Sequence, residues 1–172
     1  MSTIQDLKMR SSVQWMVRLA ILVAITIGFQ MFKLPQFITG PVVNLLLLIA
    51  CMLLGVWGGV ALGLITPLIA MVAGIMGRPE MVPVIMVANT VLVIGFSLFR
   101  GKTIQLYKTT IGIVVGSILK YGVFVIAIAY IVSLPPAAAQ MFGITQLFTA
   151  LSGGVLAIIV EKALSKTNIL QH

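Results

Sequence analysis

Long runs without a charged residue dominate the chain. No charge occurs between Lys33 and Arg78 or between Lys120 and Glu161, and each interval is much longer than the roughly 20 residues that one helical crossing of a bilayer takes. Each interval therefore predicts two crossings joined by a turn. The periodicity is helical or uniformly apolar, without the short alternating segments of a membrane β-barrel. We predict an all-α integral membrane bundle of six transmembrane helices, at residues 13–32, 41–55, 58–76, 83–99, 108–133 and 140–164.

Glycine and proline mark the predicted breaks between these helices. The breaks are expected at Gly55, Gly58-Gly59, Gly77, Pro79, Pro83, Gly101 and Leu134-Pro135-Pro136. Thr66-Pro67 also interrupts the third span, because the proline leaves a backbone carbonyl without its helical partner. We interpret it as a kink that a neighbouring helix or a cavity tolerates. The apolar stretch 19–32 lacks a small-residue cleavage site, so we interpret it as a retained first span rather than a signal peptide.

The placement of lysine and arginine predicts the orientation, because cytoplasmic loops are enriched in both. With an even number of crossings, only Lys33 and Arg78 fall on one side. The other side holds Lys8, Arg10, Arg18, Arg100, Lys102, Lys108, Lys162 and Lys166. We therefore expect both termini and the loop 100–108 in the cytoplasm. The expected outer loops are 33–40, 77–82 and 134–139.

Composition supports a membrane location and a single domain over residues 1–172. Hydrophobic residues make up 60% of the chain and charged residues 8%, whereas a soluble domain carries about a quarter charged residues. The net charge of +8 comes from small basic groups between uncharged runs, without a basic face that carries aromatic side chains, so nucleic-acid binding is not expected. The one cysteine, Cys51, lies in an apolar run and is expected to be a buried, unreactive thiol.

Lys120 is the most informative polar residue, because it lies midway along the predicted span 108–133. A base at the centre of a bilayer costs about 2.5–3.5 kcal/mol on insertion scales and usually faces the protein interior. Gly112, Gly116 and Lys120 recur every four residues and share a face, on which the glycines let another helix approach closely. Lys120 is either a counter-ion or hydrogen-bond donor for a polar ligand, or a lysine that snorkels inward or pairs with a helix-end carbonyl.

Several amides and a hydroxyl are predicted in the outer half of the bundle. Asn89 and Asn44 lie inside apolar spans, where an amide needs a partner from a ligand or a neighbouring helix. Gln140 and Gln146 flank the outer end of the sixth span, with Thr149 about one turn further in. Each of these three alone is typical of helix packing or of the membrane interface, but their clustering with Asn89 favours a polar site. Our candidate substrate-binding residues are Lys120, Asn89, Asn44, Gln146, Gln140 and Thr149.

Two further patterns predict surfaces. Arg78 and Glu80 lie in an expected outer loop, where they form either a gate over an outward-facing site or a solvated pair. Ala20, Ala24 and Gly28 place small residues at four-residue spacing along the first span, which is typical of close helix contacts in membranes. That contact is either internal or with a separate subunit.

The sequence carries no motif for catalysis or metal binding. It has no nucleotide-binding glycine loop, no HExxH pattern and no cysteine–histidine metal set. The one histidine, His172, is the last residue, and Asp6 and Glu161 lie near the expected cytoplasmic ends. We therefore expect no catalytic residue, no cofactor, no metal site, no ATP-hydrolysing motor and no enzymatic activity.

Five apolar motifs follow one another along nearly the whole chain. They are FITGPVVN at 37–44, the glycine-rich turn 55–59, LITP at 64–67, MVPVIMVAN at 81–89 and QLFTALSGG at 146–154. In this order they resemble the substrate-binding subunits (S components) of energy-coupling-factor (ECF) transporters. The chain length, six spans and cytoplasmic termini agree with that resemblance.

The resemblance implies a receptor for a vitamin or vitamin precursor in the plasma membrane of a prokaryote. The ligand would lie near the outer face, beneath the loop 33–40, which is short and needs help from 77–82 and 134–139 to close over it. Ala20 and Ala24 match the pattern with which this family docks a transmembrane coupling subunit. Two ATPase subunits then drive uptake, during which the S component is thought to topple in the membrane.

The residues favour an anionic or strongly hydrogen-bonding ligand and leave other functions open. Lys120 favours an anionic ligand, such as pantothenate, or a pyridine or pyrimidine alcohol. A membrane scaffold or assembly subunit of similar layout predicts no ligand and a region around Lys120 and Asn89 that tolerates substitution. An intramembrane enzyme is disfavoured by the lack of catalytic groups. The polar residues in the outer half favour the transport receptor.

Overall fold

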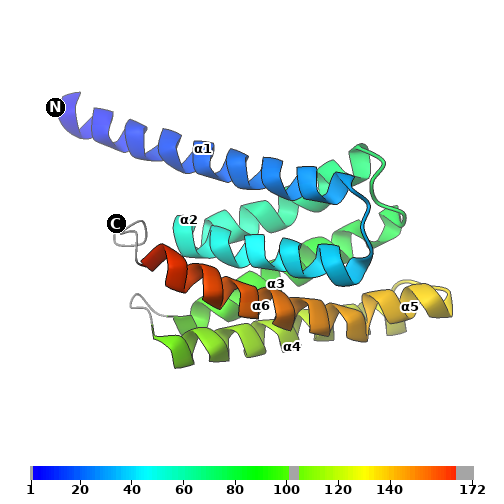
Figure 1. Ribbon diagram of the computed structural model, residues 1–172. Coiled ribbons are helices and arrows are strands. Elements are labelled where there is room, and N and C mark those ends of the chain that lie inside the picture. The colour runs from blue at the N-terminus through cyan, green and yellow to red at the C-terminus, as the bar shows by residue number, and fades with distance from the viewer. Residues whose placement is uncertain (1, 101–104, 166–172) are drawn as a thin grey trace.

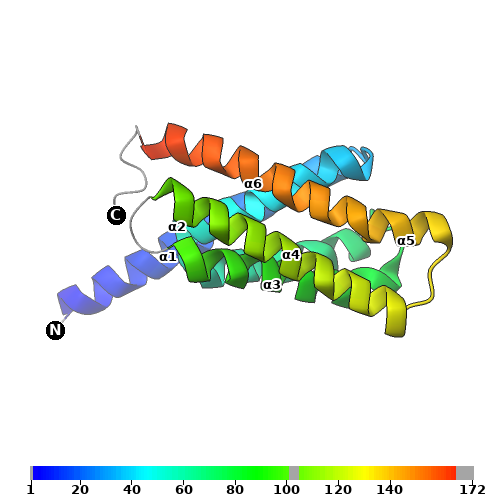
Figure 2. The same ribbon diagram turned by 90° about the horizontal axis from the view of Figure 1, so that it is seen from below.

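The described part of the chain is helical. The computed structural model describes residues 2–100 and 105–165, with side chains for 11–100 and 105–163, so Gly101, Lys102, Lys166 and His172 lie outside the described residues. The elements are α1 (Ser2–Met31), α2 (Gln36–Val72), the 3₁₀ helix η1 (Pro79–Met81), α3 (Val82–Arg100), α4 (Leu106–Tyr130), α5 (Pro136–Phe142) and α6 (Ile144–Ser165). They form an elongated bundle in which α1 begins and α6 ends at the same end (Figure 1 and Figure 2). The predicted all-α class is confirmed for these residues.

Five described segments are long and apolar enough to cross a membrane: Ser11–Met31, Gln36–Val72, Pro79–Arg100, Leu106–Tyr130 and Pro136–Ala163. Their outward faces carry large apolar side chains that are more than half exposed, among them Val72, Leu98, Ile126 and Ile159. A soluble monomer rarely exposes large contiguous apolar patches. These faces therefore suit contact with lipid, as a multi-pass membrane protein requires.

Gly55 divides α2 into two arms, 36–54 and 56–72. Its backbone is non-helical (φ 76°, ψ −178°), in a region open to glycine and costly for other residues. The arms lie side by side and antiparallel (Figure 1): an added Cβ on Gly63 would lie 3.4 Å from Leu47, and one on Gly59 would lie 3.1 Å from Cys51. The predicted break at Gly55 is therefore present, whereas the break predicted at Gly58-Gly59 is wrong, because both glycines lie inside the second arm.

The ends of α2 differ from the predicted boundaries. The expected outer loop 33–40 is wrong in extent, because α2 begins at Gln36, directly after its N-cap Pro35. The predicted span 58–76 is also too long, since the helix ends at Val72. The connection between α1 and α2 is therefore only a few residues long, and the connection from α2 to α3 is the longer of the two.

The predicted sixth span, 140–164, is interrupted by Gly143, which separates α5 from α6. α5 begins at Pro136, inside the expected loop 134–139. Proline is favoured at the first position of a helix, because the N–H that it lacks would have no helical partner there. The pair Pro135-Pro136 thus starts a helix as well as following the end of α4 at Tyr130.

Glycines let α3 and α4 pack with their backbones almost in contact. A Cβ added to Gly112 would lie 2.6 Å from the carbonyl oxygen of Phe96, and one added to Gly116 would lie 2.6 Å from that of Leu92. No side chain fits at such distances. The close approach predicted for the glycine face of α4 is therefore confirmed, and its partner is α3. Lys120 follows on the same face and is carried toward α3 as well.

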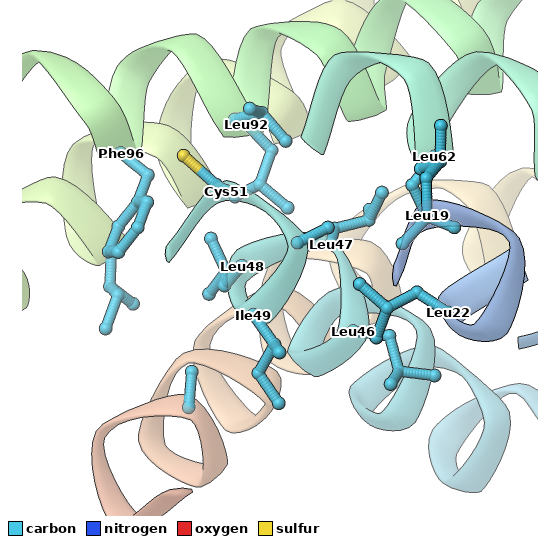
Figure 3. Close-up of a cluster of buried hydrophobic side chains, with 14 residues drawn as sticks. Leu19, Leu22, Leu46, Leu47, Leu48, Ile49, Cys51, Leu62, Leu92 and Phe96 are labelled. Atoms are coloured by element: carbon cyan, nitrogen blue, oxygen red, sulfur yellow. The ribbon is translucent and has the colours of Figure 1, made fainter. Parts of the chain in front are cut away.

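Buried apolar side chains gather toward the end of the bundle at which α1 begins and α6 ends. Leu47, Leu48 and Leu62 from the two arms of α2 lie there with Leu92 and Phe96 of α3 (Figure 3). Cys51 is buried in the same cluster, as expected. A second cluster of apolar side chains forms nearer the opposite end, from Met81, Val84, Ala88, Phe124, Ala127 and Phe142. The buried polar residues of the outer half adjoin this second cluster.

An ion pair joins the end of α3 to the end of α6. Arg100 donates to Glu161 Oε1 from Nη2 at 2.9 Å and from Nε at 3.3 Å. The Glu161 side chain is 3% exposed and that of Arg100 is 18% exposed. Since a buried carboxylate without a partner is costly, the pair fixes how α3 and α6 meet at this end.

α1 packs mainly against α2 and leaves much of its surface exposed. Trp15 Nε1 donates a hydrogen bond of 3.0 Å to the carbonyl oxygen of Leu54. Leu54 directly precedes the non-helical Gly55, where the first arm of α2 ends. Carbonyls at a helix end lack helical partners, so the Trp15 indole supplies one from α1.

Candidate functional site

Lys120 holds two amide side chains together across three helical segments. Its Nζ donates to Asn44 Oδ1 at 2.6 Å and to Asn89 Oδ1 at 2.8 Å. Asn44 comes from the first arm of α2, Asn89 from α3 and Lys120 from α4. The three residues are only 1–3% exposed. The lysine thus points inward onto two amides rather than toward a helix-end carbonyl.

Small residues allow these segments to meet. A Cβ added to Gly153 of α6 would lie 2.6 Å from Cβ of Asn44, and one added to Gly63 would lie 3.0 Å from Cβ of Asn89. A Cβ added to Gly40 would likewise lie 2.7 Å from Cβ of Thr149. The sequence therefore brings α2, α3 and α6 around Lys120 by placing a glycine opposite each polar side chain.

The hydrogen bonds continue into α6 and fix the orientation of the Asn44 amide. Asn44 Nδ2 lies 3.5 Å from Thr149 Oγ1, to which it donates, and Thr149 Oγ1 donates to the carbonyl of Gln146 at 3.1 Å. Gln146 Nε2 donates to the carbonyl of Met141 at 3.5 Å, across the break at Gly143. With its NH₂ group used by Thr149, Asn44 presents its oxygen to Lys120.

Pro67 fixes the orientation of the Asn89 amide. A helical proline has no N–H for the carbonyl four residues earlier, which here belongs to Gly63. Asn89 Nδ2 donates to that carbonyl at 3.3 Å. This confirms the expectation that a neighbouring helix satisfies the carbonyl freed at Thr66-Pro67. Asn89 Oδ1 is thereby left to face the Lys120 ammonium.

A cavity of about 440 Å³ lies above these groups. It reaches from residues 33–36 and 75–78, at the end of the bundle that holds the α1–α2 connection, down to Lys120. Its polar lining includes Thr39, Asn44, Thr66, Asn89, Lys120 and Gln146. Its apolar lining includes Val43, Ile85, Phe124 and Phe142. This mixture of apolar walls and a few convergent polar groups is typical of small-molecule sites.

The cavity has an excess of positive charge. Lys33, Arg78 and Lys120 line it, and no acidic residue does so within the described part of the chain. Glu80 pairs with Arg78 at 3.3 Å outside the lining, and Glu161 pairs with Arg100. An ammonium has three N–H donors, and among the described residues Lys120 uses two of them. One donor of a buried base is therefore left for an acceptor in the cavity.

The predicted site residues fall into two groups. Lys120, Asn89, Asn44 and Gln146 line the cavity, and Thr149 lies behind Asn44 without lining it. The structure does not bring Gln140 into the cavity, because its side chain is exposed on α5. Of the two expected gate residues, Arg78 lines the cavity. Glu80 reaches it only through its ion pair with Arg78.

Sequence reasoning missed Lys33, Phe124 and Phe142 as cavity residues. Lys33 entered only as a topology marker, although its place in the outer loop could have suggested contact with a ligand. Phe124 lies four residues after Lys120, and helical spacing places it on the same face. Phe142 stacks on Phe124 with ring centroids 6.0 Å apart, a contact between α4 and α5 that no local pattern indicates.

A shallow apolar groove follows the small residues of α1. Ala20 and Ala24 line it together with Ile65 and Ile69 of the second arm of α2. Gly28, the third predicted docking residue, is exposed further along α1, where an added Cβ would meet nothing within 4 Å. The small-residue face is thus open rather than buried within the described bundle.

Comparison with known proteins found no match. No family model, curated protein or solved structure matches the chain. Among the described residues, no group of three or more histidine, cysteine, aspartate or glutamate side chains is placed to hold a metal ion. The cavity itself is basic and lined by amides, which suits a ligand that carries hydrogen-bond acceptors.

Proposed function

We propose that the chain is the substrate-capturing S component of an ECF-type importer. The observation that carries the proposal is the buried Lys120, at the floor of a cavity of about 440 Å³. Among the described residues it has two amide partners, a spare donor and no acidic partner. A purely structural lysine would be expected to have its charge paired within the bundle. A ligand with an anionic or strongly hydrogen-bonding group, such as a vitamin precursor, completes this site.

The proposed topology has six crossings with both termini in the cytoplasm of a prokaryotic cell. Support comes from the reversal at Gly55, since arms 36–54 and 56–72 have lengths of about 28 and 26 Å at the helical rise, close to the hydrocarbon thickness. The cavity then opens outward beside Lys33 and Arg78. Single cysteines at either position, in a Cys51→Ser background, should react with an impermeant maleimide in intact cells. If these two cysteines do not react and a single cysteine at position 100 does, the orientation is the opposite of the one proposed.

The proposed partners are a transmembrane coupling subunit and two ATPase subunits. The groove at Ala20 and Ala24 supports a helix docking there, because small residues let helices approach closely in a membrane. Ala20→Leu and Ala24→Leu should therefore reduce ATP-driven uptake while ligand binding persists. Ala129→Leu, at an exposed position of α4 outside the groove, is the matched control.

Ligand capture tests the proposal most directly. Mass spectrometry of protein purified in mild detergent should reveal a co-purifying small molecule, which Lys120→Met loses and Lys108→Met retains. Both variants remove a lysine from α4, but Lys108 lies outside the cavity lining. Wild-type protein that carries no ligand, and that no vitamin tested stabilises thermally, would favour the membrane scaffold instead.

A further inference from the structure

The three basic residues of the cavity lie at two levels. Lys120 meets Asn44 and Asn89 at the floor. Lys33 and Arg78 line the mouth, on the connections that follow α1 and α2. Asn44 lies eight residues into α2 and Asn89 seven residues into α3, which places the floor about 10–12 Å below the start of each helix. A ligand that meets both levels must be elongated.

The formal charges at the two levels leave room for two negative charges. Within the described part of the chain, the lining contributes three positive charges and no negative one. Glu80 offsets one of them through its ion pair with Arg78, where the side chains are 44% and 42% exposed. The third acidic residue of the chain, Asp6, lies 24 residues before Gln30 of the cavity mouth, about 36 Å away along α1. Three minus one leaves two uncompensated positive charges, one at the floor and one at the mouth.

Lys33 occupies a backbone conformation that favours glycine. Its φ is 49°, in the left-handed region, and its N–H donates to the carbonyl of Gln30 at 3.0 Å at the end of α1. Glycine is the usual residue at such a helix end, because it has no Cβ to clash. The backbone therefore gives no reason for a lysine here, whereas its position on the cavity lining does.

Apolar side chains line much of the space between the two levels. Phe124 and Phe142 stack there, and Val43 and Ile85 line the cavity as well. The hydroxyls of Thr39 and Thr66 also line it, but each already donates to a backbone carbonyl. Such walls suit an apolar or aromatic body. The cavity thus combines basic groups at both ends with a largely apolar middle.

From this arrangement we infer that the ligand is an elongated dianion, with one acidic group on Lys120 and a second on Lys33 and Arg78. This inference rests on the proposed receptor function and adds the substrate class. The first acidic group takes the spare donor of Lys120 within the amide floor. The second takes the guanidinium of Arg78 and the ammonium of Lys33, and the apolar body lies along Phe124.

Linear dicarboxylates of increasing length test the inference. Thermal unfolding of the purified protein is measured with succinate, adipate, suberate and sebacate, and with the monomethyl ester of each. Stabilisation should peak at one of the longer diacids. The corresponding monoester should bind about tenfold or more weakly, because it loses one charge-assisted contact. The variant Lys33→Gln removes the uncompensated charge at the mouth and leaves the ion pair of Arg78 and Glu80, so it should bind that diacid and its ester about equally, whereas Arg18→Gln should behave as wild type.

The outcomes separate this inference from the receptor proposal. Three outcomes would each overturn the inference of a dianionic ligand. They are monoesters that bind as tightly as diacids, affinities that do not depend on chain length, and no stabilisation by any diacid. A co-purified monoanion that depends on Lys120 would also overturn it, while leaving the receptor function intact. If the wild-type protein binds no small molecule at all, the proposed receptor function is itself contradicted.

Discussion

Asn89 donates a hydrogen bond of 3.3 Å to the carbonyl of Gly63, which lies four residues before a proline. Helix α2 cannot use that carbonyl itself, because Pro67 lacks an N–H. A break in one helix thus sets the rotamer of an amide on another. The opposite end of that amide receives the Lys120 ammonium at 2.8 Å. Pro67 therefore positions the floor of the cavity without providing a polar group of its own.

Replacing Pro67 with alanine should weaken ligand capture without unfolding the protein. The new N–H competes for the Gly63 carbonyl, so Asn89 loses its fixed orientation and presents its oxygen to Lys120 less often. We expect retention of the co-purifying small molecule to fall severalfold, while thermal stability stays the same or rises. Pro83→Ala, at an exposed position in the first turn of α3, is the control. Retention equal to wild type would show that Pro67 has no positioning role.

Asn89→Asp should weaken capture of an anionic ligand. A carboxylate at this position neutralises the Lys120 ammonium, so an incoming anion meets no uncompensated charge at the floor of the cavity. Affinity should fall at least about tenfold, because charge-assisted hydrogen bonds contribute about 1.5–3 kcal/mol. Thermal-shift titration measures the change, and Gln140→Glu adds a charge at an exposed position outside the cavity as the control. Unchanged affinity would indicate that the ligand does not need the lysine's charge.

Gly116→Ala should destabilise the bundle by about 1–3 kcal/mol, as overpacking in a tight interface does. The added methyl would lie 2.6 Å from the Leu92 carbonyl oxygen, so α3 and α4 must separate. Gly122→Ala on the same helix is the matched control, because an added Cβ there meets nothing within 4 Å. Equal unfolding temperatures for the two variants would contradict the close packing of α3 on α4.

Glu161→Gln should lower the free energy of unfolding by about 1–3 kcal/mol, since Arg100 loses a charge-assisted partner in a largely buried setting. Glu80→Gln removes the acid of an exposed pair and should change stability by less than about 1 kcal/mol. Chemical unfolding in detergent at low and high salt distinguishes them. A Glu161 effect that disappears at high salt would indicate that the pair is solvated rather than buried.

The apolar runs and the glycine spacing predicted most of the helical layout. Gly55 marked the reversal in α2, and the face of Gly112, Gly116 and Lys120 predicted a close contact with another helix, because helical periodicity alone determines which residues share a face. The start of α2 was predicted late, at residue 41. The helix instead begins five residues earlier and carries Pro41 inside it.

The partners across the bundle could not be predicted in the same way. Lys120 bonds to residues 76 and 31 positions away, and Arg100 pairs with a glutamate 61 positions away. Such pairs depend on how helices are arranged, which propensity and spacing along one helix leave open. Gln140 was predicted as a site residue together with Gln146 at the outer end of one span, but the break at Gly143 places the two on different helices.

The hydrogen bond from Trp15 to the Leu54 carbonyl gives the protein an intrinsic fluorescent reporter. The chain has two tryptophans, and Trp57 is 78% exposed, so Trp57→Phe would leave indole emission from Trp15 alone. Movement of α1 away from α2 breaks the bond and changes the polarity around that ring. The emission wavelength then follows the docking of α1 in real time, in detergent or in vesicles, without an added dye.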